Sequence, residues 1–167
     1  MYTTIMSNNQ ILVKNANNVP CPSIQLGTWQ IGNAENVIYN ALKVGVRALD
    51  CAATYLNEKE VGKGIKRWLD ESPENKREDL FITSKLWNSC KGNVQQALNN
   101  TLEDLQIDYL DNYLVHWPSS TKGTSTRPEF PKDEYGVIIN ADIPYSDVWV
   151  EMEKAFESGR VKVSSLT

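Results

Sequence analysis

The sequence predicts an α/β fold in which parallel strands alternate with helices, and two observations carry this prediction. Short apolar, β-branched runs alternate with segments of helical apolar period through about four and a half units, which implies right-handed βαβ connections. Asp50, Lys85 and His116 each end a predicted strand, at spacings of 35 and 31 residues. Polar residues gather in this way at the carboxyl ends of the strands of a (β/α) barrel, so the spacing favours a barrel over a doubly wound sheet.

The first predicted element is a short β-hairpin over residues 10–22. Two apolar runs, Ile11–Lys14 and Val19–Pro22, flank the turn-rich tetrad Asn15–Asn18, and prolines blunt the second arm. A further apolar run, Ser23–Leu26, leads from the hairpin into the alternating part of the chain.

Strands and helices then alternate to the end of the sequence. Each helix is predicted from apolar residues that recur every three or four positions, and each strand from a short run rich in apolar and β-branched residues. The predicted strands are Val46–Asp50, Leu80–Ser84, Tyr109–Val115 and one that begins at Val161–Val163. The predicted helices are Ala34–Val44 (ending before Gly45), one that carries Val61, Ile65, Trp68 and Leu69, one over Val94–Leu105, and one that carries Trp149, Met152 and Phe156.

Helix ends and one long connection are also marked in the sequence. Asn57, followed three residues later by Glu60, resembles a capping box at the start of the second helix. Ser146 is predicted to cap the last helix and Gly159 to close it. The polar segment 119–144, rich in proline and glycine, is longer than an ordinary connection, which indicates a functional or mobile loop.

Composition excludes several classes of function. With 17 Lys and Arg against 21 Asp and Glu, the net charge is -4, and no basic stripe is present to neutralise nucleic-acid phosphates. The apolar stretches are far shorter than the ~20 residues that cross a membrane. Three cysteines without a C-x-x-C pair suit a reducing compartment, and a single histidine excludes a zinc site built from several imidazoles. The polar N-terminal lead has no features of a secretory signal, so we expect a cytoplasmic protein.

Four residues near the predicted strand ends could together protonate a carbonyl oxygen. Tyr55 is a weak acid with an ordinary pKa of ~10, and a neighbouring Lys85 ammonium would favour its phenolate form. Asp50 could hold that ammonium, and His116 could hydrogen-bond and orient the carbonyl. From periodicity alone, a purely structural role for these residues is an equally good interpretation. In that case Asp50 would be a helix cap, Lys85 would be solvated, Tyr55 would be packed and His116 would only be hydrogen-bonded.

Four separated motifs add to this pattern, and in order and spacing they resemble the aldo-keto reductase family over residues 11–162. The motifs are Leu-Gly-Thr-Trp-Gln at 26–30, Gly-Val-Arg-Ala-Leu-Asp-Cys-Ala-Ala-Thr-Tyr-Leu-Asn-Glu at 45–58, Phe-Ile-Thr-Ser-Lys-Leu-Trp at 81–87 and Asp-Tyr-Leu-Asp-Asn-Tyr-Leu-Val-His-Trp-Pro at 108–118. Within the family the chain is most similar to the fungal glycerol dehydrogenase and aldose or xylose reductase group. The resemblance implies a (β/α)8 TIM-barrel fold, of which this chain would hold about the first four βα units after its N-terminal β-hairpin.

The resemblance also implies residue roles and a cofactor. The catalytic residues would be Asp50, Tyr55, Lys85 and His116, with Tyr55 as the proton donor. The substrate would contact Trp29, Tyr55, Trp87, His116 and Trp117, although core packing is an alternative for each tryptophan. NADP(H) would lie against Gly27, Thr28, Trp29 and Asp50, and no metal is expected. The implied activity is reduction of an aldehyde or ketone to an alcohol, or the reverse oxidation of glycerol or an alditol. Cys51 and Cys90 are expected to be packing residues.

Two departures from the family pattern limit these expectations. Ala48 stands where the family often has histidine, and Val163–Thr167 ends the sequence before the family's Gly-Val-Ser-Asn-Phe strand. A complete barrel needs ~250 residues, so 1–167 is predicted to be a single partial domain, comprising the hairpin 10–22, the βα units 23–163 and the loop 119–144 within them. Two alternatives to a reductase stay open, namely an inactive truncated paralogue and a half-barrel module that self-associates through its exposed edge.

Overall fold

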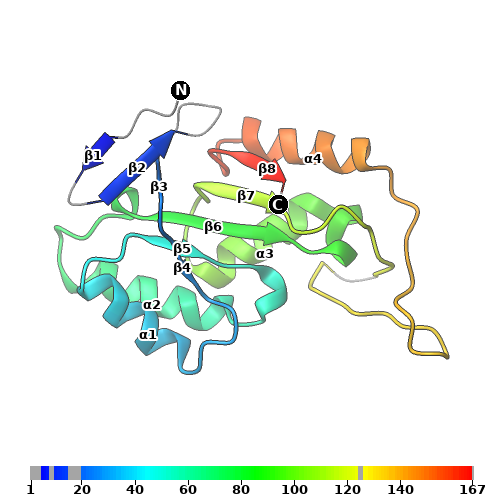
Figure 1. The fold of residues 1–167 in the computed structure, drawn as a ribbon, viewed down its shortest axis with the longest axis horizontal. Helices are drawn as coiled ribbons and strands as arrows, with labels where there is room; N and C mark the ends of the chain where they lie inside the picture. The colour runs from blue at the N-terminus through cyan, green and yellow to red at the C-terminus, as the bar shows by residue number, and fades with distance from the viewer. Residues whose placement is uncertain (1–4, 8–9, 15–19, 124–125, 167) are drawn as a thin grey trace.

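A parallel five-stranded sheet in the order β4-β5-β6-β7-β8 forms the centre of the chain (Figure 1). The computed structural model describes residues 5–7, 10–14, 20–123 and 126–166. The strands are β4 (Leu26–Gly27), β5 (Ala48–Asp50), β6 (Phe81–Leu86), β7 (Asn112–Val115) and β8 (Ser164–Leu166). The helices between them are α1 (Ala34–Lys43), α2 (Glu58–Glu71), α3 (Val94–Leu105) and α4 (Tyr145–Glu157). Strands consecutive in sequence are neighbours in space, so the predicted βαβ alternation is confirmed.

One face of the sheet packs against the helices and forms the core. Side chains of a strand alternate between its two faces, and one alternate set is fully buried in the core: Leu49, Ile82, Leu86, Tyr113 and Val115. Cys51 and Cys90 belong to the same core, as expected of packing residues, and burial raises the pKa of both thiols. The other alternate set, which includes Asp50 and Lys85, is therefore left to build the opposite face.

Helix α2 lies close to both of its neighbours because two of its residues are glycines. A Cβ atom added to Gly64 would lie 2.6 Å from the Glu35 carbonyl oxygen of α1. A Cβ added to Gly62 would lie 2.2 Å from the Asp104 carbonyl oxygen of α3. No side chain fits at such distances, so glycine sets the spacing of the helix layer on this side of the sheet.

The two predicted helix starts differ from the structure. Asn57 precedes α2 but makes no capping bond; its Nδ2 atom instead donates to the Thr28 carbonyl oxygen at 2.8 Å. Ser146 lies inside α4, whose first residue is Tyr145 and which is preceded by Pro144. Pro144 is the N-cap, and its φ of −57° already suits a helix entrance, so the helix starts two residues earlier than a cap at Ser146 would place it. The predicted end of this helix is confirmed, since Gly159 follows with φ +76°.

The N-terminal hairpin is confirmed and is part of a larger antiparallel sheet. Strands β2 (Gln10–Lys14) and β3 (Pro20–Pro22) pair as predicted. The predicted turn Asn15–Asn18 and Val19 lie outside the described residues. A further strand, β1 (Ile5–Ser7), pairs with β2 within a polar lead whose composition gave no sign of it.

Most strand boundaries shift by a few residues, and the changes share one direction. Each strand of the parallel sheet, from β4 to β8, starts later in the chain than the apolar run that predicted it, because that run begins in the approach to the sheet. Val161, for example, forms an isolated bridge to Leu110 before β8 begins. Short 3-10 helices, η1 (Ala53–Tyr55), η2 (Arg77–Asp79) and η3 (Asn88–Asn93), occur in the connections.

The long segment 119–144 extends away from the sheet, at the right of Figure 1. Its described residues are held together by isolated antiparallel bridges, Thr121 to Asn140 and Lys132 to Ile138. The segment is therefore a folded loop with backbone pairing of its own. Within the described part of the chain, no helix is long and apolar enough to cross a membrane.

Candidate active site

The carboxyl ends of β5, β6 and β7 bring three of the predicted site residues together. Asp50 is the last residue of β5, Lys85 the penultimate residue of β6, and His116 follows β7 directly. The strands are parallel and in register, with Asp50 opposite Thr83 and Lys85 opposite Leu114. These side chains therefore meet at one edge of the sheet, where the strand-end spacing in the sequence predicted them.

The buried Lys85 ammonium is the centre of this group. Its Nζ atom donates to Asp50 Oδ1 at 2.7 Å, to the Cys51 carbonyl oxygen at 2.9 Å and to Tyr55 Oη at 3.0 Å. An ammonium has three hydrogens, and each has an acceptor here. The purely structural interpretation, in which Lys85 is solvated and Asp50 caps a helix, is therefore wrong.

Tyr55 is presented to Lys85 by a tight turn after β5. It ends η1, and its amide donates to the Ala52 carbonyl oxygen at 3.0 Å. The next residue, Leu56, adopts a left-handed conformation with φ +58° before α2 begins. This turn leaves the Tyr55 hydroxyl 3.0 Å from Lys85 Nζ, as an acceptor of one ammonium hydrogen.

His116 lies beside Tyr55 and is uncharged at neutral pH. The centroids of the two rings are 5.9 Å apart, and the Trp87 ring lies 5.4 Å from the imidazole. Burial, together with repulsion from the Lys85 ammonium, lowers the pKa of His116 to about 4. A neutral imidazole has one N–H donor, which can hydrogen-bond a carbonyl oxygen without releasing a proton to it.

Three tryptophans surround the tyrosine and the histidine. Trp29 contacts the Tyr55 ring at 5.0 Å, and Trp117 stacks on His116 at 6.4 Å. Their side chains are 55% and 57% exposed, so the core-packing alternative is wrong for both. Trp87 is half-buried. These rings leave flat apolar surfaces open beside the Tyr55 hydroxyl.

The long segment 119–144 closes one side of this area. Trp87 donates from Nε1 to the Glu129 carbonyl oxygen at 3.0 Å, and its ring packs on Phe130 at 5.2 Å. A hollow of about 450 Å³ lies next to these rings, between Trp117 and Ile138. Phe130 is thus a candidate wall residue that the sequence did not single out, because its contact with Trp87 spans more than forty positions of the chain.

The residues predicted to lie near a cofactor are placed at the end of β4. Thr28 is fully buried, and both its amide and its hydroxyl donate to the Asp50 carbonyl oxygen, at 3.0 and 3.1 Å. Its hydroxyl is therefore occupied at the carboxyl end of β5. Gly27 is exposed, and an added Cβ would meet nothing within 4 Å.

Comparison with known proteins identifies the family. The family model described as "Aldo/keto reductase family" matches residues 23–167. The chain belongs to the aldo/keto reductase family. It is 43% identical over 147 residues to the NAD(P)H-dependent D-xylose reductase of Pachysolen tannophilus, covering 84% of this chain and 46% of that protein. It is 47% identical over 137 residues to the D/L-glyceraldehyde reductase of Hypocrea jecorina, covering 78% and 41%.

A solved structure supports the same assignment. The aldose reductase of Schistosoma japonicum superposes with a TM-score of 0.83 at 42% identity, over 90% of this chain and 50% of that one. The expected fold, the first βα units of a (β/α)8 barrel, is therefore confirmed. This aldo/keto reductase chain spans about half the length of the curated relatives that it matches.

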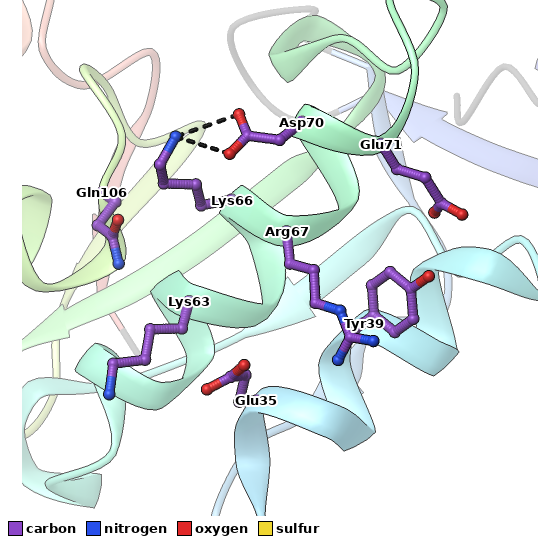
Figure 2. A pocket seen from close by; sticks show the side chains of 8 residues that line it. All are labelled: Glu35, Tyr39, Lys63, Lys66, Arg67, Asp70, Glu71 and Gln106. Carbon is purple, nitrogen blue, oxygen red and sulfur yellow. Dashed lines mark hydrogen bonds and ion pairs between the residues drawn. The ribbon is translucent and has the colours of Figure 1, made fainter.

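A second hollow of this aldo/keto reductase chain lies away from the Lys85 group. It measures about 550 Å³ and opens between α1 and α2 (Figure 2). Several of its charged side chains are engaged with one another: Lys66 pairs with Asp70, and the Arg67 guanidinium stacks on the Tyr39 ring at 3.8 Å. Geometry and charge favour the Lys85 group as the chemical site despite its smaller hollow. In the described residues no cluster of three or more histidine, cysteine or acidic side chains could hold a metal.

Glu58 is a buried carboxyl group of this aldo/keto reductase chain that periodicity alone does not reveal. It is the first residue of α2, and it accepts hydrogen bonds from the Ser84 hydroxyl at 2.6 Å and the Thr101 hydroxyl at 3.1 Å. Burial raises its pKa from the ordinary 4.5 to about 7. Ser84 points to the core face of β6 and Lys85 to the other, so Glu58 supports the fold beneath the site.

Glu58→Gln is expected to make stability less dependent on pH. The unfolded carboxyl ionises near 4.5 and the folded one near 7, so wild-type stability falls as the pH rises through this window. Glutamine does not ionise, and its advantage should grow by on the order of 3 kcal/mol between pH 4 and 8. Urea unfolding across this range measures the difference. Glu60→Gln, at an exposed position of the same helix, is the matched control and should show no such growth; equal pH slopes for the wild type and Glu58→Gln would contradict the prediction.

Proposed function

We propose that this chain carries the proton-donating machinery of an NADP(H)-dependent reductase that converts an aldehyde or ketone to an alcohol. The observation that carries the proposal is the set of three hydrogen bonds made by the buried Lys85 ammonium. It lies 3.0 Å from the Tyr55 hydroxyl and 2.7 Å from the Asp50 carboxylate. A phenol activated by a fixed cation is a suitable general acid for a carbonyl oxygen.

Each of the four side chains has a separate task in this reaction. Tyr55 donates its proton to the carbonyl oxygen, and Lys85 stabilises the phenolate that remains. Asp50 holds the ammonium in place from the other side. His116, neutral because burial lowers its pKa to about 4, donates a hydrogen bond that orients the carbonyl oxygen towards Tyr55.

The surroundings of Tyr55 suit a nicotinamide cofactor. The exposed Trp29 indole offers a flat surface in contact with the Tyr55 ring, and Gly27 leaves open space at the end of β4. NADP(H) would be held by Gly27, Trp29 and Asp50, with the buried Thr28 fixing the end of β4 beneath it, and when bound it would supply the hydride that carbonyl reduction requires. The preference for NADP(H) over NAD(H) belongs to the proposal, because the relatives include enzymes named for both cofactors.

The substrate is proposed to be a small aldehyde or its polyol product. Trp87, Trp117 and Phe130 border the hollow, and polar residues that also line it, such as Asn140, would give substrate hydroxyl groups hydrogen-bond partners. The two relatives described above are named for D-xylose and glyceraldehyde, which are small polyhydroxylated carbonyl compounds. Aromatic walls with a few polar groups suit substrates of this class.

A chimera tests whether these residues are competent. Residues 23–167 are joined to the part of the Pachysolen tannophilus reductase that lies beyond the matched segment. We expect this chimera to oxidise NADPH when D-xylose or glyceraldehyde is added, followed as loss of NADPH absorbance. The parent reductase is the positive control. A chimera that has the parent's circular dichroism spectrum and binds NADPH, yet reduces neither substrate, would refute the proposal.

A further inference from the structure

Lys91 is a buried lysine outside the catalytic group, and all three of its ammonium hydrogens are used on one short segment. Lys91 lies in η3, and the residue is 2% exposed. Its Nζ atom donates to the carbonyl oxygens of Trp117, Pro118 and Ser119 at 2.6, 2.9 and 2.7 Å. Three consecutive carbonyl groups therefore converge on a single cation.

This arrangement differs from that of a lysine buried only for packing. An apolar side chain of similar length would fill the space but would leave the three carbonyl oxygens without these donors. Among the described residues, Lys91 forms no ion pair at a distance of 4 Å or less. Its charge is balanced by peptide dipoles, which fix the backbone itself.

The segment that Lys91 holds begins directly after His116. The His116 amide donates to the Leu86 carbonyl oxygen at 3.1 Å, so β6 anchors the segment before Trp117 and Lys91 anchors it after. The Trp117 indole is stacked on the His116 imidazole at 6.4 Å with an angle of 16° between the rings. We propose that Lys91 is a positioning residue, whose ammonium fixes the Trp117–Ser119 backbone and thereby the His116 imidazole and the Trp117 indole beside Tyr55.

Loss of one proton should release this segment without unfolding the chain. A neutral amine has two hydrogens and a lone pair, so one of the three carbonyl oxygens would face the lone pair. Burial lowers the pKa of Lys91 from the ordinary 10.5 to about 8, which brings this change into reach. Between pH 8 and 10.5 the unfolded chain binds more protons than the folded chain, because the pKa of Lys91 is lower in the folded state. The free energy of unfolding therefore does not fall as the pH rises through this range. The change at pH 8 is therefore local.

The groups around the Lys91 ammonium leave its titration simple. From α4 the Tyr145 ring faces it, with Nζ 5.7 Å from the ring centroid. Burial raises the pKa of Tyr145, so this phenol stays neutral while Lys91 titrates. From the 117–119 segment it faces carbonyl oxygens, which do not titrate.

The test uses His116 as a probe, because it is the one histidine in the sequence. We record the NMR resonances of its imidazole C–H groups in the 167-residue chain between pH 6 and 10, above the range in which the imidazole itself titrates. The wild type should show an inflection at about pH 8, as the stacked Trp117 ring moves relative to the imidazole. Lys91→Met should lack this inflection.

Two further variants make the assignment specific. Lys91→Arg keeps a positive charge over the whole range, so it should show no inflection and should keep the shifts that the wild type has at pH 6. Tyr55→Phe should keep the inflection, which separates Lys91 from ionisation within the Lys85 group. An inflection at pH 8 that survives Lys91→Met, or its absence from the wild type, overturns the inference.

The catalytic meaning of Lys91 rests on the proposed function, but this test does not. It needs no turnover and no cofactor. An inflection that depends on Lys91, found together with an inactive chimera, would uphold the positioning role and refute the reductase proposal. An active chimera, found together with no inflection in the wild type, would support the reductase proposal and refute the positioning role of Lys91.

Discussion

Tyr55→Phe is expected to abolish nearly all carbonyl reduction by the chimera, lowering kcat by about 10²–10⁴-fold, the usual contribution of a positioned general acid. The substitution removes one oxygen atom, and with it the proton that the carbonyl oxygen needs. The ring itself should stay in place, because its contacts with Trp29 at 5.0 Å and His116 at 5.9 Å do not involve the hydroxyl. Lys85 keeps its bonds to Asp50 and to the Cys51 carbonyl oxygen.

Two measurements separate a chemical effect of Tyr55→Phe from a structural one. Steady-state oxidation of NADPH gives the loss of kcat, and quenching of tryptophan fluorescence reports NADPH binding, which should change little. Tyr135→Phe is the matched control, since Tyr135 is an exposed tyrosine of the 119–144 segment, and it should leave kcat unchanged. Turnover within tenfold of the unmodified chimera would show that Tyr55 is not the proton donor.

The part of this site that the sequence could predict is the part that local periodicity determines. Asp50, Lys85 and His116 were placed at strand ends by apolar runs that stop there, and parallel strands necessarily bring their carboxyl ends to one edge. Tyr55 lies in a turn and has no periodicity of its own; its place in the loop after the second strand suggested it, and the family motifs then implied its role as proton donor. The structure then joined these residues through one ammonium group.

The rest depended on contacts between distant segments, which no local pattern records. Asn57 has the sequence of a helix cap, but its amide is used by the Thr28 carbonyl group, 29 residues away. Phe130 reaches Trp87 only because the 119–144 segment brings it back to the residue that follows β6. Lys91 looks like an ordinary polar residue of a connection, and its role appears only when the backbone after His116 is seen to converge on it.

Asp111 shows the same limit at the opposite end of the sheet, just before β7. It is 4% exposed, and its carboxylate accepts from the Arg77 guanidinium at 2.8 Å, the Ile82 amide at 2.9 Å and the Lys162 ammonium at 3.0 Å. Arg77 and Lys162 also lie over the Tyr109 ring, at 4.0 and 4.2 Å. One carboxylate thus joins the entrances of β6, β7 and β8, far from the reacting groups.

Asp111→Ala is therefore expected to lower the free energy of unfolding by about 3–5 kcal/mol, the effect of removing one partner of a buried ion pair. The Arg77 guanidinium, which is largely buried, would lose its counter-charge, and the Ile82 amide would lose its acceptor. Asp111→Asn should lose less, because its side-chain oxygen can still accept from the Ile82 amide.

Urea unfolding of the 167-residue chain measures this effect, with Asp70→Ala as the matched control. Asp70 pairs with Lys66 at 2.8 Å, but its side chain is 62% exposed, and an exposed pair within one helix contributes about 0–1 kcal/mol. The two aspartates differ chiefly in burial, so a large loss for Asp111 beside a small one for Asp70 would assign the effect to the buried carboxylate. Equal losses would mean that the Asp111 cluster is no stronger than a surface pair, and that the strand entrances are held by the apolar core alone.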